Sequence, residues 1–264
     1  MPIEIRPIGD ADERQLAELL HARHAAHRAA EPLLAADDAS AELERLLGGD
    51  AVTGVVAVRG GEPLAYLAGQ VRENDLWHRH VWIDYAGHAG QELEPIRDLY
   101  AAAAPAWIDA GARLHLAMVP ALAEMMDSWY RLGFAQMLQH GIRQSGGEPA
   151  QPPSGVTIRE GGKDDLERVA ETQGRLIWEQ QALAATFTGL TAPSAETLLA
   201  DWQETFIDPS DTLFLAERDG EMVGHTLLYR PEPALGIPSD AVRLATTAVV
   251  PHERGRGIGL ALSR

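Results

Sequence analysis

Residues able to bind phosphate lie close together near the end of this 264-residue chain. In the run Arg254-Gly-Arg-Gly257-Ile-Gly259, glycines alternate with two arginines and other residues directly after an apolar, β-rich segment. Glycine lets the backbone turn several N–H groups toward one point and lets a ligand approach closely. Where such a turn opens a helix, the helix dipole also favours negative charge. The run therefore predicts a loop that binds a diphosphate group.

Three glycine-rich phosphate motifs compete for this run. A P-loop needs Lys-Ser/Thr after its last glycine, but Leu260 follows here. The dinucleotide fingerprint needs Gly-x-Gly-x-x-Gly, which the spacing of the three glycines does not give. The pattern Arg/Gln-x-x-Gly-x-Gly/Ala after a strand fits Arg254, Gly257 and Gly259 position by position. Taken alone, the segment is also compatible with an ordinary strand–helix turn. It resembles the motif of the GNAT superfamily of acyl-CoA-dependent N-acyltransferases.

The elements that would position this loop occur twice in the chain. A strand at 3–6 followed by a helix from residue 10 returns at 156–159 and 163, at a constant offset of 153 residues. A strand–turn–strand hairpin at 52–67 returns at 212–229, at an offset of 159 residues. The sequence therefore predicts two related domains.

The order strand, helices, hairpin, strand, helix predicts an α/β fold, with a mixed sheet and helices on both faces in each domain. A run rich in proline and glycine at 145–155 predicts a linker between domains 1–144 and 156–264. The first domain is expected to continue through a helix at 94–110, a strand at 112–118, a helix at 121–132 and a closing strand at 134–142.

The first domain carries a second GNAT-like signature. Trp129-Tyr-Arg-Leu-Gly-Phe134 resembles Tyr-x-x-x-Gly-Phe, with tryptophan in the place of the tyrosine and Tyr130 one place over. The two signatures together imply two tandem GNAT-like domains. Compared with the first domain, the second lacks about its last third, so we expect it to be C-terminally incomplete.

The first domain is expected to have lost the coenzyme. Aligning His88 with His252 places Glu92 opposite Arg256. A carboxylate about 6 Å from a phosphate oxygen costs ~3 kcal/mol at an effective dielectric constant near 20. Pro95 also removes an N–H donor. We therefore interpret domain 1–144 as a degenerate copy with a structural or pocket-shaping role.

The resemblance implies that acetyl-CoA lies between the fourth and fifth strands of the second domain. Strand backbone groups would bind the pantetheine arm and polarise the thioester carbonyl, and the loop would bind the pyrophosphate. The residues implied are Thr247, Ala248, Val249, Arg254, Gly255, Arg256, Gly257, Ile258 and Gly259.

An amine would then attack the carbonyl with help from a general base and a general acid. His225 is the candidate base because its ordinary pKa suits the task, with a packed histidine or a water relay as the alternatives. The family's usual acid, a tyrosine, would lie beyond Arg264.

The function implied is that of an acetyl-CoA-dependent N-acetyltransferase acting on a primary amine of a small molecule. A tandem architecture with an inactive first copy is also similar to mycothiol synthase, which makes the amine of a thiol precursor one option. The alternative is a non-catalytic coenzyme A-binding or scaffold protein.

Composition restricts the partners. A net charge of −17 disfavours nucleic acid and anionic lipid, and it suits a cationic acceptor. The sequence has no apolar run of the ~20 residues that a membrane helix needs. The absence of cysteine fits a reducing compartment, so we expect a cytoplasmic protein. His21, His24 and His27 recur on one predicted helix, but we expect a solvated face there and no metal site. Oligomeric state is left open.

Overall fold

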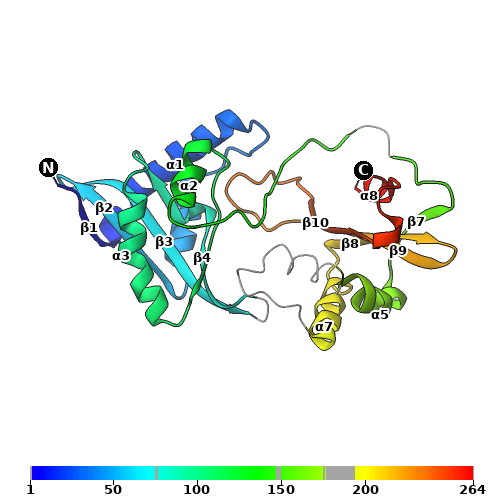
Figure 1. Cartoon of the computed structure of the whole chain (residues 1–264). Coiled ribbons are helices and arrows are strands. Elements are labelled where there is room, and N and C mark those ends of the chain that lie inside the picture. Colours follow the sequence, from blue (N-terminus) through cyan, green and yellow to red (C-terminus); the bar gives the residue numbers. More distant parts are fainter. Residues whose placement is uncertain (1, 75–76, 147–149, 175, 177–193, 264) are drawn as a thin grey trace. The chain divides into compact units, whose positions relative to one another are not determined.

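The computed structural model describes residues 2–74, 77–146, 150–174, 176 and 194–263. The chain divides into two compact units. Unit 1 comprises Met1–Arg143 and Pro233–Pro238, and unit 2 comprises Gln144–Glu232 and Ser239–Arg264. Each unit has its own sheet with helices on both faces (Figure 1), which confirms the predicted α/β class. The predicted mixed sheet is present in unit 1, whereas the strands described in unit 2 pair only antiparallel.

Unit 1 contains a mixed sheet of order β1-β2-β3-β4-β6, with β5 paired to β3. Neighbouring strands are antiparallel except β4 and β6, which are parallel. Its elements in chain order are β1 (Glu4–Pro7), η1 (Asp10–Asp12), α1 (Glu13–Ala30), α2 (Ala39–Leu47), β2 (Val52–Arg59), β3 (Glu62–Asn74), β4 (His78–Ile83), η2 (Tyr85–Gly87), β5 (His88–Gly90), α3 (Ile96–Asp109), β6 (Leu114–Ala117) and α4 (Ala123–Tyr130).

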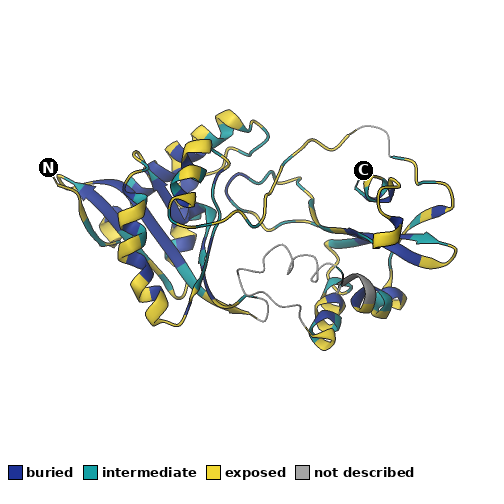
Figure 2. Ribbon diagram, in the orientation of Figure 1, coloured by how far each residue is buried: buried dark blue, intermediate teal, exposed yellow. Residues whose placement is uncertain are grey.

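The two faces of this sheet bury two separate cores, visible as dark strands between the helices in Figure 2. Successive side chains of a strand point to opposite faces. Tyr66 therefore packs with α1 and α2, whereas its neighbour Leu67 packs on the face that holds Trp107 of α3 and Trp129 of α4. The alternation of apolar side chains along β2 and β3 thus gives unit 1 helices on both faces.

Unit 2 contains an antiparallel sheet of order β10-β9-β8-β7. One face packs against α7 and the π-helix η4, and the other packs against α8. Its described elements in chain order are β7 (Val156–Glu160), η3 (Lys163–Asp165), α5 (Leu166–Arg168), η4 (Val169–Gly174), α7 (Ala195–Thr205), β8 (Asp211–Arg218), β9 (Glu221–Tyr229), β10 (Arg243–Val249), η6 (Pro251–Glu253) and α8 (Ile258–Leu262).

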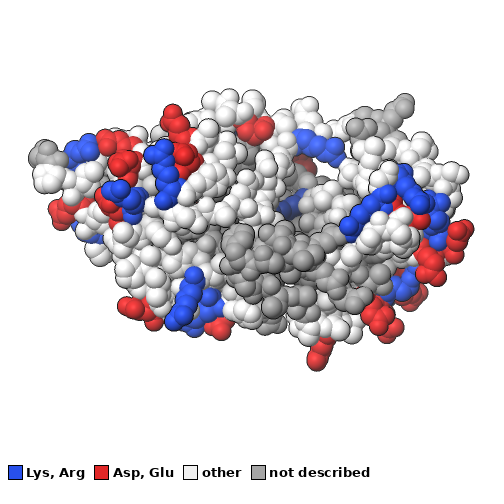
Figure 3. Space-filling model, in the orientation of Figure 1, with Lys and Arg blue, Asp and Glu red and all other residues white. Residues whose placement is uncertain are grey.

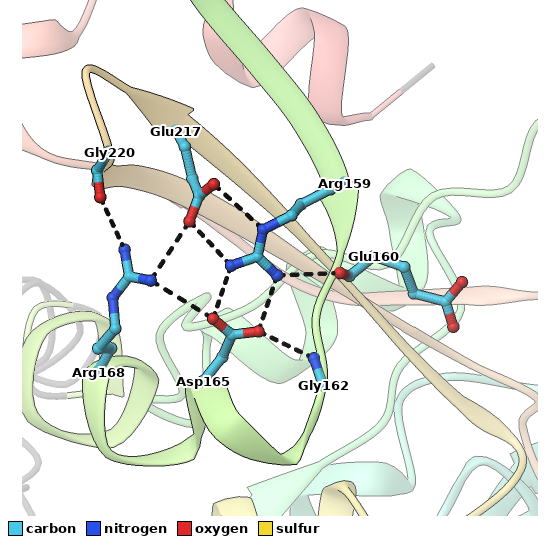
Figure 4. A network of polar contacts seen from close by, with 7 residues as sticks. All are labelled: Arg159, Glu160, Gly162, Asp165, Arg168, Glu217 and Gly220. Carbon is cyan, nitrogen blue, oxygen red and sulfur yellow. Dashed lines mark hydrogen bonds and ion pairs between the residues drawn. The ribbon is translucent and has the colours of Figure 1, made fainter.

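Both units begin with the same ion pair between the first strand and the turn after it. In unit 1, Arg6 donates two hydrogen bonds of 2.6 and 2.7 Å to the Asp12 carboxylate. In unit 2, Arg159 does the same to Asp165 at 2.7 and 2.8 Å, and Glu217 of β8 joins the pair (Figure 4). The repeat seen in the sequence therefore extends to side-chain geometry.

The closing strand predicted at 134–142 is wrong. These residues form no helix or strand. Phe134 packs edge-on against Trp129 and Tyr100, but Leu138 is 60% exposed. The preceding strand β6 is only 4 residues long, so it offers a short edge for pairing.

One part of unit 1 comes from far along the chain. Between β9 and β10, residues Pro233–Pro238 belong to unit 1, and Leu235 is buried in its core. The division predicted at 144–145 places this segment in the second domain, so sequence periodicity did not reveal it.

Candidate coenzyme-binding site

The predicted diphosphate loop, residues 254–259, follows β10 and the short helix η6 in unit 2 and includes the first two residues of α8. The amide of Val250 donates to Val223 of β9 at 2.9 Å, which fixes the chain before the loop. Ile258 is 1% exposed and packs in the core, which fixes the chain after it. Between these two anchors, residues 254–257 are exposed. The N–H groups of a first helical turn have no partner within the helix, so those of α8 need a partner outside it.

The three glycines of the loop differ in what the fold requires of them. Gly255 and Gly257 have φ angles of 74° and 88°, which side chains rarely adopt. Gly259 has no such angle, and a Cβ atom there would lie 3.8 Å from Val249 Cγ2, an ordinary contact. The protein alone gives no reason for glycine at 259, whereas a ligand that approaches the backbone does.

A buried glutamate organises the arginines. Glu253 is 7% exposed, and its carboxylate lies 3.3 Å from both Arg256 Nη1 and Arg218 Nε. Arg254 donates from Nε to the Val249 carbonyl at 2.9 Å. Three guanidinium groups and one carboxylate therefore give the loop a local positive charge within an acidic chain.

Sequence reasoning missed Glu253 and Arg218 as part of this site. The spacing of Glu253 and Arg256, three residues apart, was an available signal. Arg218 lies 35 residues earlier, and only the pairing of β8 with β9 and of β9 with β10 brings it to the loop.

The strand residues predicted to hold the pantetheine arm lie at the edge of the sheet. Among the described residues, β10 has β9 on one side and no strand on the other. In an antiparallel pair, alternate residues face the partner strand. Because Val250 bonds to β9, Ala248 faces β9 as well, and Thr247 and Val249 direct their backbone groups to the open edge. Two of the three predicted residues thus offer free-edge backbone groups, although Arg254 already bonds to the Val249 carbonyl.

His225, the candidate base, lies in the core of unit 2. Its side chain is 0% exposed and packs edge-on against Trp202, with Nε2 3.3 Å from the Thr246 hydroxyl. Burial lowers the pKa of His225 to about 4. The imidazole is therefore neutral at pH 7 but has no exposed surface through which to meet an acceptor. Thr226 follows His225 in β9, and its hydroxyl lies 2.7 Å from the hydroxyl of Thr247 in β10.

The sheet register corrects the alignment of the two units. The Gln91 amide donates to the Leu64 carbonyl at 2.9 Å, as Val250 does to Val223. Leu64 and Val223 hold equivalent places in their hairpins, so Gln91 corresponds to Val250. The match of His88 with His252 is therefore wrong.

Unit 1 has a shorter loop rather than a repulsive side chain in the place of Arg256. Residues 91–95 separate the sheet from α3 in unit 1, whereas residues 250–257 precede α8 in unit 2. Glu92 pairs with Arg59 at 2.9 and 3.2 Å, and Arg59 occupies the hairpin position of Arg218. Glu92 therefore pairs with the hairpin arginine of unit 1 as Glu253 does with that of unit 2, and residues 91–95 contain no arginine or glycine.

In unit 1, the space between β5 and α4 is filled by side chains. The rings of His88 and Trp129 pack edge-on with centroids 5.0 Å apart, and His88 Nε2 lies 3.0 Å from the Met118 carbonyl. Burial lowers the pKa of His88 to about 3. A cavity of about 20 Å³ remains beside them, room for about one water molecule.

The histidines of α1 do not form the solvated face that the spacing suggested. His24 is 3% exposed, and the Nδ1 atoms of His24 and His27 lie 3.2 and 2.9 Å from the Tyr85 hydroxyl. Burial lowers the pKa of both imidazoles. His21 is exposed. Within the described ranges, no group of three potential ligands could hold a metal ion.

Charges of both signs are interspersed on the face shown in Figure 3.

Across the helices that the structure describes, none is both long and apolar enough to span a bilayer.

Comparison with known proteins identifies the class of the C-terminal part. Residues 177–264 match the model of the Acetyltransferase (GNAT) family. The first part of the match, 177–193, lies outside the described residues, and the rest includes β8, β9, β10, the loop and α8. This segment is therefore a GNAT acetyltransferase domain, which belongs to a class of acyltransferases with acetyl-CoA as co-substrate. No curated protein matches the chain.

Solved structures similar to the chain include a mutant BH1408 protein from Bacillus halodurans, with 16% identity over 54% of this chain and 99% of that one and a TM-score of 0.46. The aminoglycoside N-acetyltransferase AAC(6')-Iy in complex with CoA has 15% identity, 55% and 95% coverage, and a TM-score of 0.40. The ribosomal-protein-alanine N-acetyltransferase from Brucella melitensis biovar Abortus 2308 has 13% identity, 55% and 100% coverage, and a TM-score of 0.41.

Proposed function

We propose that this protein transfers the acetyl group of acetyl-CoA to a primary amine of a small molecule, and that unit 2 binds the coenzyme. The observation that carries the proposal is the loop at 254–259, where two left-handed glycines and a glycine without a structural role lie beside arginines. The GNAT family match over the same residues supports it.

In the proposed reaction, the loop binds the diphosphate and the open edge of β10 binds the pantetheine arm. A neutral amine attacks the thioester carbonyl carbon, so that an N–C bond forms and the C–S bond breaks. The amine loses a proton to a base, and the departing thiolate gains one. The backbone N–H groups of β10 at its free edge would stabilise negative charge on the carbonyl oxygen.

Unit 1 is proposed to be a degenerate GNAT-like copy that does not bind coenzyme. The repeated ion pair at Arg6 and Arg159, the equivalent hairpins and the shortened loop at 91–95 support this interpretation. The strongly acidic composition supports a cationic acceptor, and the lack of cysteine supports a cytoplasmic location.

The substitution Arg256→Glu tests the proposal. It removes a positive charge from the loop and adds a negative one, so we expect affinity for coenzyme A to fall at least about tenfold at low salt. Isothermal titration calorimetry measures this. Arg113→Glu changes the charge equally at an exposed position of unit 1 and should leave affinity unchanged. Equal affinity in wild type and Arg256→Glu contradicts the proposed site.

A second candidate is a non-catalytic coenzyme A-binding protein. The observation that favours it is that β10 carries no carboxylate or imidazole and that His225 is buried. Assay of free thiol distinguishes the two functions. Release of coenzyme A from acetyl-CoA only when an amine is present supports the enzyme, whereas binding without release across a broad amine panel supports the second candidate.

A further inference from the structure

The connection between β9 and β10 contributes to the core of the other unit. Residues 233–238, which we name the anchor segment, belong to unit 1 although both flanking strands belong to unit 2. Leu235 of this segment is 6% exposed. It lies in the core cluster that α1 and α2 form with Tyr66, together with Leu16, Leu19, Leu20, Ala39, Leu43 and Leu46.

Two hydrogen bonds of the Gly236 backbone, one of them to a side chain, fix the anchor segment in addition to its apolar contact. The amide of Gly236 donates to Asp37 Oδ2 at 2.8 Å, and the amide of Ala35 donates to the Gly236 carbonyl at 2.9 Å. Gly236 has a φ angle of 87°, and a Cβ atom there would come 3.1 Å from His24 Cε1. The site therefore selects glycine both for backbone conformation and for space.

Anchoring matters for β10 because this strand has little other support. Among the described residues it pairs only with β9, and its outer edge is open. The connection runs from Tyr229 to Arg243, and a tether in its middle replaces one long loop with two short ones. Shorter loops lose less conformational entropy when their ends are fixed, so the tether favours a paired β10.

We propose that unit 1 anchors the β9–β10 connection through Leu235 and Gly236 and thereby positions β10. Leu235 is then a positioning residue: it touches no substrate but holds the start of the strand that carries Thr247 and Val249. This gives the unit without a coenzyme loop a defined role. The effect on coenzyme affinity rests on the function proposed above, whereas the effect on β10 itself does not.

Hydrogen–deuterium exchange of the full chain, followed by mass spectrometry, tests the proposal. Leu235→Ser removes the buried apolar side chain. We expect amides in peptides that cover β10 to exchange at least about tenfold faster, together with those of α2. Asp37→Ala removes only a hydrogen-bond acceptor on an exposed residue, so the core stays intact. It should accelerate exchange at both places by a smaller factor.

Val242→Ala is the matched control, because Val242 lies in the same connection but is 61% exposed. It should leave exchange in β10 as in the wild type. Faster exchange in α2 with β10 within about twofold of wild type, in both Leu235→Ser and Asp37→Ala, would overturn the proposal.

Titration with coenzyme A provides the second readout. We expect the dissociation constant of Leu235→Ser to rise at least about threefold although the 254–259 loop is unchanged. An unchanged dissociation constant contradicts the link between anchoring and binding. A wild-type chain that binds no coenzyme A contradicts the proposed function instead, and the exchange of β10 still decides whether the segment anchors it.

Discussion

At the scale of single residues, Gly259 differs from the other glycines of the loop because the fold does not require glycine there. Gly255 and Gly257 have backbone conformations that side chains rarely adopt, so the unliganded protein already explains them. Gly259 lies in α8 with room for a methyl group. Alanine would normally be preferred over glycine in a helix. Glycine at this position agrees with the proposed site, in which the coenzyme approaches the backbone.

Gly259→Ala should weaken the binding of coenzyme A without destabilising the fold. We expect the free energy of unfolding to stay the same or rise by up to about 1 kcal/mol, and affinity for coenzyme A to fall about tenfold through a loss of about 1.4 kcal/mol. Denaturant titration and calorimetry measure the two quantities. Gly257→Ala is the comparison, because a side chain in its left-handed conformation costs about 1–2 kcal/mol of stability. Full affinity in Gly259→Ala would show that the position has no contact with the coenzyme.

At the scale of elements, each sheet is joined to the turn that follows its first strand by an arginine–aspartate pair. In unit 2 the pair is extended, because Arg168 and Glu217 join Arg159 and Asp165 (Figure 4). Asp165 is buried and also accepts a hydrogen bond from the Gly162 amide at 3.0 Å. The hydrogen bonds from Arg159 lower the pKa of Asp165 to about 2.

Asp165→Asn should therefore destabilise unit 2. Loss of a charged acceptor that holds two hydrogen bonds from Arg159 costs about 2 kcal/mol. Because the pKa of Asp165 is lower in the folded state, the stabilisation is present above about pH 4 and is lost as pH falls toward about 2. Denaturant unfolding at pH 7 measures the loss. Asp164→Asn, at the exposed neighbouring position, should change stability by less than about 0.5 kcal/mol.

Elements were predictable from the sequence where their signals are local. The hairpins β2–β3 and β8–β9 lie where the sequence places them, because alternating apolar residues and a glycine-containing turn determine them over short distances. The strand expected at 134–142 failed because a strand also needs a partner edge. β6 has only 4 residues, and the segment stays unpaired.

At the scale of the whole molecule, each unit has a buried histidine whose protonation opposes folding. His88 in unit 1 has a pKa of about 3, and His225 in unit 2 has a pKa of about 4, in both cases because of burial. Unfolding restores an ordinary pKa near 6.5. The unfolded chain therefore binds more protons below that pH, and both units lose stability as pH falls from about 6.5 to about 4.

His225→Gln should weaken this pH dependence in unit 2. A pKa difference of about 2.5 units corresponds to about 3 kcal/mol, so between pH 7 and pH 4 the wild type should lose about that much more stability than the variant. Unfolding curves monitored by hydrogen exchange in β9 provide the measurement. His88→Gln is the matched variant and should affect exchange in β5 of unit 1 instead. Parallel curves for wild type and His225→Gln would contradict the buried, neutral state. Loss of acetyl transfer in His225→Gln with normal stability would support a role as base.

The sequence by itself determined the hairpins, the α/β class and the glycine- and arginine-rich segment at 254–259 that we propose binds the diphosphate, because each depends on residues close together in the chain. Tertiary structure decided which groups meet. The contact of Glu253 with Arg218, the burial of His225 and the place of Leu235 in unit 1 depend on strand register and on contacts between distant segments. Register is also what showed that the loop of unit 1 is short. A change in loop length displaces a sequence alignment, whereas the hydrogen bonds of a sheet show which residues of the two units are structurally equivalent.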